Sequence, residues 1–67
     1  MDISARNQIK GTVASIKTGE IMAEVVVAIG GQLLVSVITR SSVERLGLKV
    51  GDAVTAIIKS TEVMLGK

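Results

Sequence analysis

The sequence predicts an all-β fold, a small Greek-key β-barrel with one short helix. Three observations support this prediction. Apolar residues recur at every second position in four segments, which is the period of a β-strand. Short turns that contain glycine separate most of these segments, and the chain has no proline. The single helix signal is short, and its spacing does not fit the strand–helix–strand units of a parallel sheet.

The first two strands are predicted over residues 9–16 and 21–29, with a turn at 17–20 between them. Uninterrupted alternation would place Val13 and Ser15 on one face of the first strand and Ile16 on the other. Gly11 within this strand predicts a bulge or a sharp bend. The second strand is largely apolar on both faces, so we expect a helix or another subunit to cover its second face.

The Gly30-Gly31 pair predicts a tight hairpin into a third strand over residues 32–39. Ser41 or Ser42 is then expected to cap a short helix through residues 43–46. With Ser41 as the cap, Glu44 would complete a capping box. Gly47 is suited to the left-handed position that ends a helix.

A fourth strand is predicted over residues 53–59, with Val54, Ala56 and Ile58 facing inward. Residues 63–65 are apolar and are expected to form a final turn or a pairing segment. The order of three strands, a short helix and a fourth strand resembles a partly open barrel of the oligonucleotide-binding (OB) type. Residues 1–67 are read as one domain, because no repeat or linker divides them.

The composition predicts an oligomer. A domain of 67 residues has a marginal core, and small folds usually add disulfides, a metal or a partner subunit. The chain has no cysteine or histidine and no cluster of acidic residues, so it offers no direct metal ligands. Hydrophobic residues nevertheless make up 48% of the sequence, and the mean hydropathy is +0.57. We expect the excess apolar surface to form subunit contacts.

The residue types disfavour catalysis and leave two classes of ligand open. Histidine and cysteine, the commonest general base and the strongest nucleophile, are absent, so we expect a binding protein and not an enzyme. An OB-like shape allows single-stranded nucleic acid as a partner. Such binding relies on aromatic stacking and a basic groove, whereas this chain has no aromatic residue and a net charge of +2. Nucleic acid is therefore the alternative partner, and a small oxyanion is the first choice.

Oxyanion binding is predicted from the two ends of the chain. Arg6 lies just before the first strand and Lys59 lies at the end of the last, so these cations converge if the two strands are neighbours. Backbone N–H groups near Ala5 and Arg6 would add donors. The hydroxyl donors that we consider are Ser4, Thr39, Ser42 and Ser60. The structural alternatives are a solvated Arg6, a strand-end Lys59, a helix-capping Ser42 and an ordinary strand residue at Thr39.

Three segments of the sequence resemble the Mop domain, or molbindin, family. They are Ser-Ala-Arg-Asn-Gln-Ile-Lys-Gly at positions 4–11, Val-Ile-Thr-Arg-Ser-Ser-Val-Glu-Arg-Leu-Gly-Leu at 37–48 and Thr-Ala-Ile-Ile-Lys-Ser-Thr-Glu-Val-Met at 55–64. The first and last segments are the more specific. They occur in family order and together span essentially the whole chain, so the resemblance covers a single Mop domain over residues 1–67.

The resemblance implies an OB-like barrel that binds molybdate or tungstate as the free oxyanion. It further implies a hexamer, arranged as a trimer of dimers, with binding sites between subunits and a role in cytoplasmic storage or homeostasis. No membrane segment is predicted, in agreement with this. Carried over residue by residue, the resemblance implies two sets of oxyanion-binding residues: from one subunit Ser4, Ala5, Arg6, Lys59 and Ser60, and from a neighbour Thr39 and Ser42. Asn7 and Thr61 are further candidates, with a structural role as the alternative.

Overall fold

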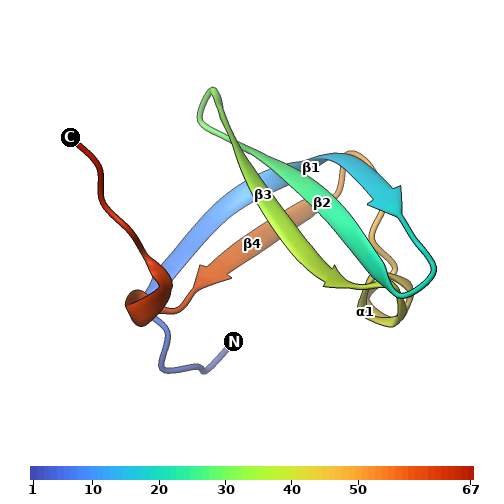
Figure 1. Cartoon of the computed structure of the whole chain (residues 1–67), viewed down its shortest axis with the longest axis horizontal. Helices are drawn as coiled ribbons and strands as arrows, with labels where there is room; N and C mark the ends of the chain where they lie inside the picture. Colours follow the sequence, from blue (N-terminus) through green and yellow to red (C-terminus); the bar gives the residue numbers. More distant parts are fainter.

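A computed structural model describes all residues, Met1–Lys67. Its body is one antiparallel sheet with strand order β3-β2-β1-β4, which is the Greek-key order (Figure 1). The elements are β1 (Asn7–Thr18), β2 (Met22–Ile29), β3 (Gln32–Thr39), the helix α1 (Arg40–Leu46), β4 (Ala53–Ile58) and the 3₁₀ turn η1 (Ser60–Glu62). The prediction of an all-β fold with one short helix is confirmed.

Strand β1 organises the sheet, because it pairs with a different strand along each half. Its first half pairs with β4, from Asn7↔Ile58 to Thr12↔Ala53. Its second half pairs with β2 and ends at Thr18↔Ala23. The long curved strand β1 in Figure 1 therefore connects β4 on one side of the sheet with β2 and β3 on the other.

A bulge in β1 lies between Val13 and Ser15, and not at Gly11 as the sequence suggested. The extra residue reverses the alternation, because one residue of β2 now faces two residues of β1. Val13 is buried, and Ile16 rather than Ser15 packs against the core. The prediction that Ser15 shares the inner face with Val13 is therefore wrong.

Gly11 is needed for close packing. A β-carbon at this position would lie 2.6 Å from Val27 Cγ1 and 2.7 Å from the carbonyl oxygen of Ala28. Any side chain here would push β1 and β2 apart, so the glycine permits the close approach of the two backbones.

The core is small, and the sheet is not closed. The buried residues are Val13, Ala23, Val25, Val27 and Val43. Strands β3 and β4 are both sheet edges. A groove of about 770 Å³ is lined by residues of β2, β3 and β4, among them Leu34 and Val54. Val54, Ala56 and Ile58 are half-buried while the residues between them are exposed, which confirms their predicted inward orientation.

Apolar residues on the outside of the chain have no cover within it. Leu33, Val35 and Val37 of the edge strand β3 are 67%, 59% and 61% exposed. Residues 63–65 pair with no strand of the same chain, so the pairing expected for this segment does not occur there. No helix of the structure is long and apolar enough to cross a bilayer.

Candidate functional site

The pairing of β1 with β4 brings the two ends of the chain together. Asn7 lies opposite Ile58 in the last pair of the ladder. Arg6 and Lys59 are the next residues on either side of this pair, so their backbones leave the ladder at the same end of the sheet. Figure 1 shows the N-terminal segment and η1 at the same end of the molecule. The predicted convergence of the first and last strands is therefore confirmed. We call Ser4, Ala5, Arg6, Lys59 and Ser60 the terminal cluster.

The two cations of the terminal cluster are exposed and have no ion-pair partner. The one ion pair in the structure joins Arg40 to Glu44, far along the chain. Arg6 and Lys59 form no side-chain hydrogen bond, although Glu62 lies only three residues after Lys59. Like charges at the same end of a sheet repel each other, so an anion bound between them would relieve the repulsion.

The remaining members of the terminal cluster supply hydrogen-bond donors. Lys59 precedes η1 with an extended backbone at φ −65° and ψ 130°, and its carbonyl accepts a hydrogen bond from the N–H of Glu62 at 2.9 Å. Ser60 and Thr61 lie within η1 and are exposed. Ser4 is exposed as well, and Ala5 is half-buried. None of these hydroxyl groups is engaged within the chain, so they can donate to a ligand.

Asn7 has a different setting from the rest of the predicted site. It is half-buried and forms the first residue of β1, directly opposite Ile58. This position favours the structural role that was the alternative for Asn7.

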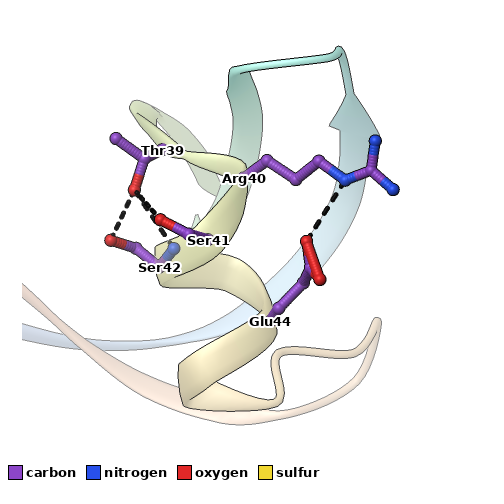
Figure 2. Close-up of polar contacts among 5 residues, drawn as sticks. All are labelled: Thr39, Arg40, Ser41, Ser42 and Glu44. Carbon is purple, nitrogen blue, oxygen red and sulfur yellow. Dashed lines mark hydrogen bonds and ion pairs between the residues drawn. The ribbon is translucent and has the colours of Figure 1, made fainter.

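A second group of hydroxyls lies at the start of α1 (Figure 2). Thr39 is the N-cap, with its Oγ1 accepting from the backbone N–H of Ser42 at 3.1 Å. The helix therefore begins at Arg40, and the prediction that Ser41 or Ser42 caps it is wrong. The capping box is wrong too, because Glu44 Oε1 instead pairs with Arg40 Nε at 3.2 Å. The extended end of β3 explains this, since it already gives Thr39 the backbone of a cap.

The hydrogen bonds in this group separate Thr39 from Ser42. Thr39 Oγ1 donates to Ser42 Oγ at 2.7 Å, which uses its only hydroxyl hydrogen. Ser41 is then the donor in its 3.2 Å contact with Thr39. Ser42 Oγ accepts from Thr39 and, at 3.4 Å, from Arg45 Nη2, so its own hydroxyl hydrogen stays free. Thr39 is thus saturated and orients Ser42, which can donate outward.

The two groups lie at opposite ends of one chain. Thr39 pairs with Met22 beside the far end of β1, whereas Arg6 precedes the near end of the same strand. β1 has 12 residues and runs between the two groups in a molecule whose longest extent is 34 Å. Figure 1 shows η1 and α1 at opposite ends of the sheet. One chain therefore does not bring Thr39 and Ser42 to the terminal cluster.

Two residues near these groups were not singled out by the sequence. Arg45 places a cation beside Ser42, and the helical i, i+3 spacing of the two residues could have predicted this contact. Gln8 contacts the terminal cluster through a hydrogen bond from its Nε2 to the carbonyl oxygen of Ala5, at 2.7 Å. No spacing rule for a strand predicts that contact, because residues 5 and 8 would point away from each other in a continuous strand.

Comparison with known proteins identifies the family. The sequence of the TOBE-domain family matches residues 3–65 of this chain. Molybdenum-pterin-binding protein 1 of Clostridium pasteurianum is 56% identical over 66 residues, which cover 97% of this chain and 97% of that protein. These matches take in both the terminal cluster and the start of α1.

Solved structures agree. A molybdate-binding protein from Sporomusa ovata superposes with a TM-score of 0.95 at 45% identity, over 100% of both chains. The cytoplasmic molybdate-binding protein ModG, in a crystal form with molybdate bound, gives a TM-score of 0.85 at 44% identity over 90% of this chain and 43% of its own. These relatives are binding proteins. The chain belongs to the TOBE-domain family and, within it, to the small molybdenum-binding Mop proteins, also called molbindins.

Proposed function

We propose that this protein binds molybdate, or the nearly isosteric tungstate, as a free oxyanion. The observation that carries the proposal is the convergence of Arg6 and Lys59 beyond the Asn7–Ile58 pair, with no carboxylate to neutralise either charge. A guanidinium and an ammonium attract a dianion, and the hydroxyls of Ser4 and Ser60 can replace part of its hydration shell. The molybdate-binding relatives of nearly equal length support the choice of ligand.

We further propose that each site lies between subunits of a homohexamer. The support is geometric, since the terminal cluster and the Ser42 hydroxyl lie at opposite ends of one chain but would meet across a subunit contact. The open groove and the exposed apolar face of β3 supply surface for such contacts. Ligand binding and assembly would then stabilise each other, because the bound anion contacts both partners.

The role that we propose is storage or homeostasis of the oxyanion in the cytoplasm. It is supported by the likeness to ModG, a cytoplasmic molybdate-binding protein. Charge and hydrogen bonds hold the ligand without a covalent bond, so it can be released when its free concentration falls. Selectivity against sulfate would follow from size, because donors spaced for the larger anion lie too far apart for the smaller one.

Mixed oligomers of two variants test the intersubunit site. Arg6→Ala removes a ligand group from one side of the proposed site, and Ser42→Ala removes a donor from the other. Each variant alone should bind molybdate weakly in equilibrium dialysis. Oligomers refolded from an equal mixture should regain part of the tight binding, because some sites then combine an intact Arg6 with an intact Ser42.

Two results of these binding experiments would contradict the proposals. No recovery in mixed oligomers, with recovery in a control mixture of wild type and either variant, would place both residues in one subunit's site and contradict the proposal. Absence of molybdate binding by the wild-type protein would refute the ligand itself.

A further inference from the structure

Gln8 makes the one hydrogen bond that fastens the N-terminal segment to the sheet. Its Nε2 donates to the carbonyl oxygen of Ala5 at 2.7 Å. No other hydrogen bond of the structure, from backbone or side chain, involves residues 1–6. Gln8 itself lies in β1 opposite Ile57, so its backbone position is fixed by the ladder with β4. Because the sheet holds Gln8 in place, this hydrogen bond restrains the segment that carries Arg6.

The group that Gln8 holds is the peptide between Ala5 and Arg6. A trans peptide is planar, with its C=O and N–H pointing in opposite directions. Because the Ala5 carbonyl points toward Gln8, the Arg6 N–H points away from it. This N–H makes no hydrogen bond within the chain. Rotation of the same peptide by half a turn would exchange the two groups and present a carbonyl oxygen, which repels anions.

We propose that Gln8 is a positioning residue for the oxyanion site: it orients the Ala5–Arg6 peptide so that the Arg6 N–H, and not the Ala5 carbonyl, faces the bound anion. The inference rests on the proposed function, and it names the residue that orients a backbone donor independent of the Arg6 side chain. Gln8 itself does not touch the ligand. Only the –NH₂ end of its amide can donate to a carbonyl, so the role requires an amide or another donor of equal reach.

The first test compares two glutamine substitutions. Gln8→Met keeps the length of the side chain and removes its donor, and Gln32→Met is the matched control at the only other glutamine. Calorimetric titration with molybdate should show about fivefold weaker binding for Gln8→Met, the factor for one hydrogen bond of ordinary strength. Gln32→Met should bind as the wild type does. Unchanged affinity in Gln8→Met, with wild-type binding intact, would overturn the inference and leave the proposed function standing.

A spectroscopic test covers the case in which Gln8→Met does not assemble. The chain has three arginines, so protein labelled with ¹⁵N-arginine gives three backbone amide signals, of which Arg6→Lys identifies one by its loss. On addition of molybdate to the wild-type protein, the Arg6 amide proton should move downfield as it donates to an oxygen. If the chemical shift of the Arg6 amide proton does not change at saturating molybdate, the inference is overturned. If the wild-type protein does not bind molybdate at all, the proposed function is refuted instead.

Discussion

Asn7 and Ile58 form the last pair of the β1–β4 ladder, and this pair directs the chain ends toward each other. Arg6 and Lys59 follow immediately on either side, so this end of the sheet carries two cations, neither of which has an ion-pair partner. Evidently the fold tolerates this repulsion in water, where it is weak. An anion bound between the two side chains would turn the repulsion into attraction.

Arg6→Ala and Lys59→Ala should each weaken molybdate binding by at least about tenfold, because each removes a charge-assisted hydrogen bond. Both side chains are exposed and form no hydrogen bond or ion pair within the chain. The oligomer should therefore persist in size-exclusion chromatography. Lys17→Ala is the control, since Lys17 is an exposed lysine of β1 that lies outside the terminal cluster. Equal affinity in all three variants would remove the terminal cluster from the site.

Gly11→Ala should destabilise the protein by roughly 1–3 kcal/mol, the usual cost of forcing extra atoms into a packed site. The added carbon would meet the Ala28 carbonyl at 2.7 Å, and a paired backbone cannot yield cheaply. Urea denaturation followed by circular dichroism measures the change. Gly66→Ala is the control, because nothing lies within 4 Å of its β-carbon. A Gly11→Ala variant as stable as the control would show that β1 and β2 do not approach as closely as described.

Thr39→Ala should cost about 1 kcal/mol of stability, because it removes the N-cap of α1. It should also weaken molybdate binding, since Ser42 Oγ loses the donor that orients it. Thr39→Ser keeps the hydroxyl and should restore both properties in urea denaturation and calorimetry. Weakened binding in Thr39→Ser as well would mean that the methyl group, and not the hydroxyl, matters.

Val37→Lys tests the assembly. Val37 lies on the outer face of the edge strand β3 and is 61% exposed in the single chain, where a lysine would be tolerated. If this face forms a subunit contact, the new charge is buried, and light scattering should report smaller particles at the same concentration. Gln32→Lys introduces the same charge at the hairpin end of β3 and should leave the particle size unchanged. A wild-type protein that is monomeric at micromolar concentration would contradict the oligomer altogether.

The sequence predicted the strands well, because alternation and glycine turns are local signals. All four strands and the Gly30–Gly31 hairpin are found, although β1 extends two residues beyond the predicted 9–16 at each end and takes in residues 17 and 18, which were assigned to a turn. The position of the bulge could not be predicted, since Gly11 was the visible irregularity while the extra residue is Ala14, which has no unusual side chain. That residue decides whether Ser15 or Ile16 reaches the core.

The site was predictable only in part. The neighbouring position of the first and last strands, on which the expected convergence of Arg6 and Lys59 depends, is confirmed by the β1–β4 ladder, and the convergence of the two side chains stays a prediction. The cap was misplaced by two or three residues, because serines are as good N-caps as threonine and sequence alone does not show where β3 ends. The contact of Gln8 with Ala5 depends on how the chain turns before β1, for which the sequence has no periodic signal.

Calorimetric titration of the wild-type protein with molybdate, in the presence of excess sulfate, tests the central claim most directly. The account predicts tight, saturable heat for molybdate and for tungstate, with sulfate neither producing heat nor reducing the affinity. A folded oligomer that gives no heat with either large oxyanion, or one that sulfate displaces as readily, would show that Arg6 and Lys59 do not form a site for these anions.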